Sequence, residues 1–550
     1  MSQLKTYRLF FIAIIFVTSC NKDFLSIENP NDLSAESFWS TEDEVQQGLI
    51  ATYGALQLNG LLGGNAAIEL PVRSDVGRPN NWNANAIGLN TLSFNENTQI
   101  VQLRWRDAYI GIYRANQVLS NLSNVEITDN THVQIEAEAR FLRAFFYYSL
   151  YKGYNGGSVI IHTSIPEMRS DFYKKPSPAT KVYDLILADL EFAYENLPMS
   201  YENSADLGRA TWGAATAMLG KLHINEHNYE VAKAYFKEIL DSNIYALTSN
   251  IAHNFDEEHE FNQESIFEVA FSIEAKPGTS GGAADGPTGS EATSRSRGLA
   301  TTQGGGYRTV MPSYYMTMLF KNDIMDMTNP INANRTGTAK YSVRASSSIA
   351  ISDDDNSTMY QLSSDKGGAY NNNEASYLKK FQNWWLESES DQSISGINER
   401  VIRLADVMLL YAECLLQTEG NYIDALELVN SIRIRAGVVP LLEADYDEVS
   451  LMEHIMWVER PLELMFEGHD IRWEDLTRWG KIKEQYERLA DKSYVVIAKE
   501  LHEYDPNIHS VTSDKILKEF VEAFKVYSPD AHNYFPIPST ELNSNPDFLD

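Results

Sequence analysis

Apolar side chains recur every three to four residues over long stretches of this 550-residue chain. This spacing puts them on one face of an α-helix and predicts amphipathic helices that pack against one another. At Ser40–Glu44, hydroxyl side chains stand just ahead of acidic ones, which is typical of a helix start. The chain is therefore predicted to be mostly helical. Helical segments are expected at residues 40–58, 100–122, 131–152, 178–197, 211–240, 400–435 and 449–488.

Two short segments share a local pattern. Asn228–Ala232 and Asn421–Ala425 each carry Asn-Tyr followed by a small alanine, between two apolar helical segments. A tyrosine and an alanine at this spacing are typical of a tetratricopeptide half-repeat, in which paired helices pack closely. We expect a mostly α fold of tetratricopeptide-like helix pairs, forming a single helical body with long irregular insertions and a few short strands.

Residues 1–19 have the pattern of a lipoprotein signal peptide. Two basic residues precede the apolar run Leu9–Val17, which is too short to span a bilayer. The sequence Val-Thr-Ser-Cys that ends at Cys20 resembles a lipobox, in which the cysteine is acylated and becomes the mature N-terminus. The alternative is an ordinary signal peptide or an uncleaved anchor with a chance cysteine. Residues 20–40 are then expected to form a lipid-anchored tether.

Acidic residues outnumber basic ones by 76 to 45, so the formal net charge is −31. Removing residues 1–19 takes away two basic residues and no acidic one, which makes the net charge −33. Such a chain is unsuited to binding nucleic acid, since phosphate recognition needs a surplus of Lys and Arg. With Cys20 acylated, Cys414 has no disulfide partner and is expected to be a buried thiol.

Motifs for catalysis or metal binding are weak. Gly278–Gly282 matches G-x-S-x-G, but no helix pattern follows to present Ser280 as a nucleophile. The sequence has no phosphate loop and no His-Glu-x-x-His zinc pair, so neither metal nor cofactor is expected. Asp353–Asp355 lacks the alternating ligands and glycine of a calcium loop and is expected to be a solvated acidic loop.

Aromatic residues in polar loops are the candidate ligand contacts. Trp82 lies between Asn81 and Asn83 in an amide-rich loop. An indole ring can stack on the apolar face of a sugar while neighbouring amides reach its hydroxyls. For every candidate, packing into the fold is an open alternative. The further candidates are Tyr307 and Arg308, after three glycines, and Trp384 and Trp385, beside two lysines.

The chain is predicted to have three parts after the tether. Residues 275–310 are rich in Gly, Ser, Thr and Ala and are expected to be loop that buries no core, and residues 325–400 are also irregular. Long loops in a compact protein are usually functional. The predicted organisation is an N-terminal helical part with tetratricopeptide-like pairs at 41–274, a loop-rich ligand-binding insertion at 275–399 and a C-terminal helical part at 400–550.

Several longer motifs resemble one known family. They include Arg403–Glu413, Asn430–Gly437, Glu459–Gly468, Asp475–Gly480 and Phe535–Pro538, with Cys20–Leu25, Ala137–Ala144 and Gly208–Ala210 in matching order before them. Together they resemble the SusD/RagB family of outer-membrane nutrient-binding lipoproteins. Charges of both signs alternate at helical spacing within these motifs, which predicts a structural ion-pair network. The residues concerned are Glu459, Arg460, Glu463, Glu467, Asp475 and Arg478.

The resemblance implies a fold, a location and a partner. Similar proteins are helical, non-catalytic and lipid-anchored on the outer face of the outer membrane, where they cap a SusC-like TonB-dependent β-barrel transporter. The leading hypothesis is that this chain captures glycan or oligosaccharide and delivers it to such a transporter. The alternatives are peptide capture by the same machinery, and a surface glycoside hydrolase, whose carboxylate pair is defined by a distance that sequence does not supply.

Overall fold

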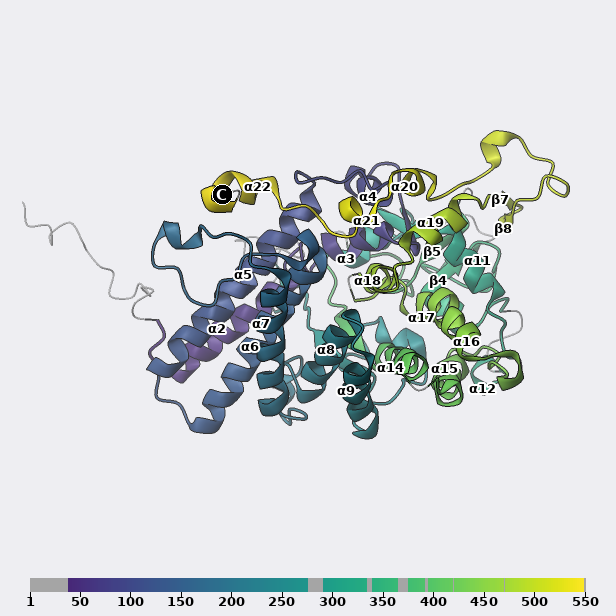
Figure 1. Ribbon diagram of the computed structural model, residues 1–550. Coiled ribbons are helices and arrows are strands. Elements are labelled where there is room, and N and C mark those ends of the chain that lie inside the picture. The colour runs from purple at the N-terminus through teal and green to yellow at the C-terminus, as the bar shows by residue number, and fades with distance from the viewer. Residues whose placement is uncertain are drawn as a thin grey trace, which may run out of the picture.

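The computed structural model describes residues 38–275, 290–333, 339–364, 374–390, 394–418, 420–468 and 470–548. The predicted signal peptide, Cys20 and the Ser280 motif lie outside these residues, so what the sequence predicts for them stays a prediction. Figure 1 shows the N-terminal helices side by side at one end of the molecule, with the later helices continuing the row. The C-terminal segment runs across the top of this row in that view.

The first helices form where the periodicity predicts them. They are α2 (Glu42–Gly54), α5 (Gln99–Asn121), α6 (Asp129–Gly153) and α7 (Ala179–Asn196). A reciprocal capping box between Thr41 and Glu44 begins α2. Helices α5 and α6 pack so closely that a methyl group added at Gly111 would run into the Phe146 ring. The capping box confirms the helix start predicted at Ser40–Glu44.

The two Asn-Tyr segments join paired helices, as predicted. Asn228 precedes α9 (Tyr229–Asp241), which packs on α8 (Trp212–Asn225). Asn421 likewise precedes α15 (Tyr422–Arg435), which packs on α14 (Leu404–Thr418). Because α9 also packs against α14, the two pairs form one continuous layer. The prediction of a mostly helical fold with tetratricopeptide-like pairs is confirmed.

The helical run predicted at 449–488 is instead broken into pieces. It contains α16 (Glu448–His454), a π-helical turn (Ile455–Glu459), α17 (Arg460–Leu464), α18 (Ile471–Arg478) and α19 (Ile482–Ala490). Pro461 is the second residue of α17 and follows the π-helical turn directly, so the change in helical hydrogen bonding falls where proline has no amide hydrogen to donate. Gly468 and Gly480 have positive φ angles of 55° and 66°, a conformation that ends helices.

The strands are short and pair antiparallel in twos. The pairs are β1 (Gly77–Pro79) with β3 (Val310–Pro312), β2 (Ser265–Val269) with β6 (Glu399–Arg403), β4 (Ile349–Ile351) with β5 (Ser376–Leu378), and β7 (Tyr494–Ile497) with β8 (Glu500–Glu503). Residues 400–403 were expected to be helical, and this prediction is wrong because β6 finds a distant partner in β2. Pairing across more than 100 residues leaves no local signal in the sequence.

Segments expected to be loop contain buried, ordered structure. They include α10 (Arg295–Leu299), α11 (Tyr314–Asn322), α12 (Pro330–Ala333) and α13 (Val343–Ser348). Ala292, Leu299 and Ala300 are buried, so the expectation that 275–310 buries no core is wrong for its described part. Small residues allow this: Gly306 lies against Ala300 with no room for a side chain.

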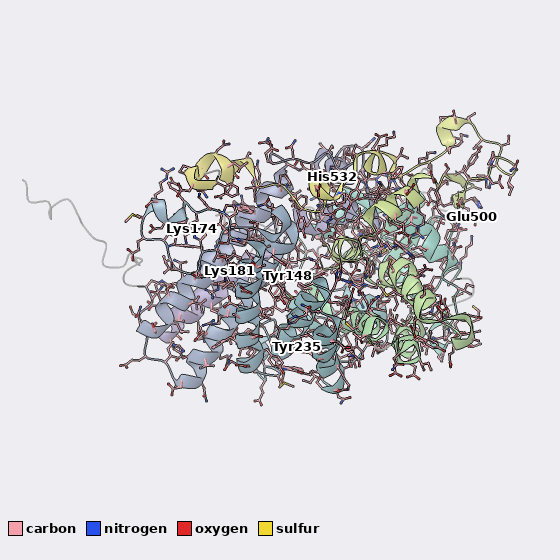
Figure 2. The ribbon with its side chains drawn as sticks, in the orientation of Figure 1. Tyr148, Lys174, Lys181, Tyr235, Glu500 and His532 are labelled. Atoms are coloured by element: carbon pink, nitrogen blue, oxygen red, sulfur yellow. The ribbon has the colours of Figure 1, made fainter. Side chains whose placement is uncertain are left out.

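Asp353 was expected in a solvated acidic loop, and this prediction is wrong. Its side chain is 6% exposed and lies 2.6 Å from Lys340 Nζ and 3.3 Å from Lys321 Nζ. Burial alone would raise the pKa of Asp353, but the hydrogen bond from Lys340 and the charge of Lys321 lower it. Glu500 of β8, labelled in Figure 2, joins the cluster 3.2 Å from Lys321 Nζ.

A large hydrophobic cluster connects residues from Val45 to Ile537 and includes Cys414, whose side chain is fully buried. Since every residue of this core lies at Val45 or beyond, a chain that starts at residue 21 keeps all of these packing contacts. Within the described ranges, no helix is both long enough and apolar enough to cross a membrane.

The charged residues of the family motifs form buried ion pairs, as predicted. Arg403 Nη1 lies 2.6 Å from Glu264 Oε1 and 2.7 Å from Glu463 Oε1, and its Nε lies 2.5 Å from Glu467. Arg460 pairs with Asp475 at 2.7 Å, and Arg478 pairs with Glu413 at 3.1 Å. These side chains hold α14, α17 and α18 together.

Candidate ligand-binding surface

The pairing of β1 with β3 brings two distant loops together. Asn80, just after β1, donates its backbone N–H to the Thr309 carbonyl at 2.9 Å. Its side-chain Nδ2 donates to the Arg308 carbonyl at 3.0 Å. The loop that carries Trp82 is therefore fixed against the loop that carries Tyr307, although they lie more than 220 residues apart in sequence.

Trp82 and Tyr307 form an exposed aromatic pair. Their side chains are 54% and 48% exposed, their ring centroids lie 6.3 Å apart, and the ring planes meet at 68°. Trp82 Nε1 donates to the Tyr307 carbonyl at 3.0 Å, which satisfies the only polar atom of the indole. The exposed part of the Trp82 side chain is therefore indole carbon, and its ring is oriented by this hydrogen bond.

The two asparagines beside Trp82 differ in their surroundings. Asn83 Oδ1 accepts from the Ala86 amide at 2.9 Å, which caps α4 (Ala84–Asn90), and Asn83 Nδ2 donates to Glu69 Oε1 at 3.2 Å. Asn83 is thus used by the fold. Asn81 is exposed, and its side-chain amide makes no hydrogen bond to another described residue. Asn81 is the freer of the two to meet a ligand.

Glu69, at the end of α3 (Asn65–Glu69), lies beneath this loop. Burial raises its pKa to about 6, against the lowering effect of hydrogen bonds from Asn83 and Asn85. Its second oxygen, Oε2, is buried and has no partner among the described residues. The anchor of the Trp82 loop is therefore a carboxyl group that resists ionisation.

Tyr307 and Arg308 are positioned by α10. The Tyr307 amide donates to the Arg297 carbonyl and the Arg308 amide to the Ala300 carbonyl, at 2.9 and 2.8 Å. The Arg297 guanidinium lies 5.1 Å from the centre of the Tyr307 ring, a cation–π contact. Arg308 has a positive φ of 48° and lies 3.9 Å from Glu374. Its Nε and Nη1 make no hydrogen bond to a described residue.

Trp384 and Trp385 are half-buried, with ring centroids 5.8 Å apart and planes almost perpendicular. Trp384 packs on a small cluster that contains Tyr360 and Tyr377, and Lys379 Nζ lies 4.0 Å from its ring centre. The structure thus gives Trp384 a packing role, and a ligand role for either tryptophan stays a prediction.

The Trp384 loop adjoins the glycine loop before Tyr307. The Glu389 amide donates to the Gly304 carbonyl at 2.8 Å, and Tyr360 leaves no room for a side chain at Gly304. We call Asn81, Trp82, Tyr307 and Arg308 the Trp82 surface. Of the predicted residues, these four lie on the two joined loops, whereas Asn83 caps α4 and Trp384 packs on the cluster of Tyr360 and Tyr377.

Sequence reasoning missed three contributors to this surface. Arg297 lies on the Tyr307 ring, Glu69 holds Asn83, and Glu374 pairs with Arg78 and lies near Arg308. Each acts on a residue far away or on another element, so no local pattern points to it. Within the described part of the chain, no group of three or more His, Cys, Asp or Glu side chains is arranged to hold a metal ion.

Comparison with known proteins agrees with the helical fold. The model of the SusD family matches residues 263–549, more than half of the chain. A second family model, described as starch-binding associating with outer membrane, matches residues 23–224. SusD-like protein P38 of Formosa agariphila is 26% identical over 514 residues, which cover 88% of this chain and 93% of that protein.

Solved structures share the architecture over almost their whole length. A SusD superfamily protein from Bacteroides vulgatus has a TM-score of 0.76 and 23% identity, with 93% of this chain and 98% of that one covered. A laminarin binding SusD-like protein has a TM-score of 0.66 and 23% identity, with 92% and 100% covered. With its family motifs, its buried ion pairs and a family-model match over more than half of its length, the chain belongs to the SusD family.

Proposed function

We propose that this chain is a cell-surface lipoprotein that captures glycan or oligosaccharide on the Trp82 surface and delivers it to a SusC-like TonB-dependent transporter. The observation that carries the proposal is the exposed pair of Trp82 and Tyr307, whose loops are joined by the hydrogen bond of the Trp82 indole. Aromatic faces that are oriented before binding suit the apolar faces of sugar rings, since less side-chain freedom is lost when the ligand binds.

Polar groups next to the rings support a sugar ligand. The exposed side-chain amide of Asn81 makes no hydrogen bond to another described residue and can bond to hydroxyls. One structural relative is named as binding laminarin, and one matching family model is described as starch-binding. None of the relatives named above is called an enzyme, which favours a binding role without catalysis.

Affinity electrophoresis against a panel of polysaccharides tests glycan capture. The chain lacking residues 1–20 is compared with Trp82→Ala and Tyr307→Ala, which we expect to lose most of the retardation. Met199→Ala is the control, since Met199 is 48% exposed like Tyr307 but lies outside the Trp82 surface. No retardation by any glycan would reject the proposal, and equal retardation of Trp82→Ala would reject the surface. Release of reducing ends would favour a hydrolase.

Delivery and anchoring need separate tests. Acylation of Cys20 would place the protein at the outer membrane, and Cys20→Ser is expected to release it from the membrane fraction of cells. Co-purification with a TonB-dependent barrel encoded beside it is expected for the transporter partner. If the wild-type protein is purified from the cell envelope without any barrel, the proposal of delivery is contradicted.

A further inference from the structure

A second site lies away from the Trp82 surface. A cavity of about 570 Å³ that is open to solvent is lined by α5, the segment 160–173 and α22 (Ser539–Ser544), and none of its lining residues belongs to the Trp82 surface. Figure 1 shows α22 next to α5, and Figure 2 labels Lys174, which follows the segment. Cavities of about 300–1,000 Å³ are typical of small-molecule sites, so this one has the size for a ligand of its own.

The walls of the cavity are mainly apolar, and two of their aromatic rings are held by hydrogen bonds. Trp105 Nε1 donates to Glu541 Oε2 at 3.3 Å. The Tyr109 hydroxyl donates to the Ile160 carbonyl at 2.8 Å and accepts from the Ile160 amide at 2.9 Å. Their polar atoms are thus used by the protein, which leaves carbon faces toward the cavity. The ring-bearing wall residues are Trp105, Tyr109, Tyr113, Phe172 and Tyr173.

One positive charge on the wall is uncompensated. Arg169 lines the cavity and forms no ion pair with any described residue. By contrast, Arg106 is paired with Asp107 at 2.6 Å. The Glu541 carboxylate accepts from Trp105 and from Asn545 at 3.3 and 2.9 Å and keeps its negative charge. Arg169, which is exposed, is therefore the lining cation that is left for a ligand anion.

His162 adds a neutral polar group to the same wall. Burial and the nearby charge of Lys174 lower the pKa of His162 to about 4, so its ring is uncharged at pH 7. The ring nitrogens make no hydrogen bond to a described residue, which leaves one donor and one acceptor for a ligand.

We propose that this cavity binds a small aromatic acid, an aromatic ring joined by a short linker to a carboxylate. The ring packs on Trp105 and Tyr109, and the carboxylate pairs with Arg169, whose guanidinium suits planar anions. An unsubstituted sugar carries no anion to pair with the Arg169 guanidinium. A plain hydrocarbon would leave Arg169 unused. The same chemistry is found in free aromatic acids and at the C-terminal aromatic residue of a peptide.

Calorimetry with 3-phenylpropionate tests the proposal on the chain lacking residues 1–20. We expect saturable binding, weakened roughly 10- to 100-fold in Arg169→Gln, the range for a lost charge-assisted hydrogen bond. Phe172→Ala is also expected to weaken binding. Lys181→Gln, which removes a cation with a 71% exposed side chain outside the cavity, should bind as the wild type does. Thermal unfolding of each variant verifies that it is folded.

Further arms decide the source and separate this site from the Trp82 surface. Tighter binding of Gly-Phe than of Phe-Gly would assign the site to peptide ends, and binding of 3-phenylpropionate alone would assign it to free aromatic acids. Trp82→Ala should lose glycan binding and keep 3-phenylpropionate binding, so each of the two proposed sites can be rejected independently of the other. No saturable binding at millimolar ligand would overturn the proposal, as would unchanged affinity of Arg169→Gln or equal affinity for uncharged 3-phenylpropanol.

Discussion

The Asn83 side chain donates a hydrogen bond to Glu69 Oε1 at 3.2 Å while its own oxygen caps α4. This relationship ties the loop of Trp82 to a buried carboxyl group whose pKa is raised to about 6. Because the folded chain holds this proton more tightly than the unfolded chain does, the carboxyl costs stability as pH rises through the interval between the two pKa values. Ionisation of Glu69, which anchors the Trp82 loop, therefore lowers the stability of the folded chain.

We predict that Glu69→Gln gains stability over the wild type when the pH rises from 4 to above 6. A rise in pKa from 4.5 to about 6 corresponds to about 2 kcal/mol of lost stability once Glu69 is ionised. Urea unfolding of both chains at pH 4 and pH 7.5 measures this difference. Glu126→Gln, at an exposed position, controls for the loss of one negative charge. Parallel pH profiles of the Glu69→Gln variant and the wild type would contradict the prediction.

The buried ion pairs are expected to be sensitive to the loss of one partner. Glu463 contacts Arg403, Arg435 and Arg344, and burial, which would raise its pKa, is outweighed by these three arginines, which lower it. Glu463→Gln should destabilise the fold by about 3–5 kcal/mol, because it leaves buried positive charge uncompensated. Equilibrium unfolding in urea at pH 7 gives the value.

The control for this variant is an exposed ion pair. Glu484 pairs with Lys481, and its side chain is 55% exposed. Glu484→Gln should change the free energy of unfolding by less than about 1 kcal/mol. If the two variants lose similar stability, the interpretation of the buried network as a structural element is wrong.

Local patterns predicted the helices well and the contacts between them poorly. The bounds of α5, α6 and α7 lie within two residues of those expected, because amphipathic spacing is written along each helix. Trp82 and Tyr307 were both selected from the composition of their own loops. Their mutual hydrogen bond depends on the pairing of β1 with β3, whose strands lie more than 200 residues apart. Nothing local to either loop encodes that pairing.

Lysines beside Trp384 illustrate the opposite error. Lys379 and Lys380 suggested an exposed, polar loop, yet both side chains are buried. Lys380 pairs with Glu467 of the ion network, and Lys379 lies on the Trp384 ring. A charged residue is expected at the surface unless a partner is known. The partners of these two lysines, Glu467 and the Trp384 ring, become apparent only in the folded structure.

Cys414 should be unreactive in the folded protein. Its side chain is fully buried in the core, and burial raises the pKa of the thiol. In the chain lacking residues 1–20 it is the sole cysteine. We expect labelling by a thiol-specific disulfide reagent to be on the order of 100-fold slower in buffer than in denaturant, where one thiol per chain reacts. Rapid stoichiometric labelling under native conditions would contradict its burial.

Close packing of α5 on α6 predicts opposite effects for two glycine substitutions. Gly111→Ala drives a methyl group into the Phe146 ring and should destabilise the fold by about 1–3 kcal/mol, since a packed core yields little.

Gly54, at the end of α2, has a helical φ of −57°, and an added Cβ there meets nothing within 4 Å. Gly54→Ala should therefore stabilise by about 0.5–1 kcal/mol, because alanine lowers the entropy of the unfolded chain. Urea unfolding measures both, and because the substitution is chemically the same, the difference in sign reports on the space around each glycine alone. A loss of stability at Gly54 as large as that at Gly111 would show that helix propensity and packing do not separate in this way.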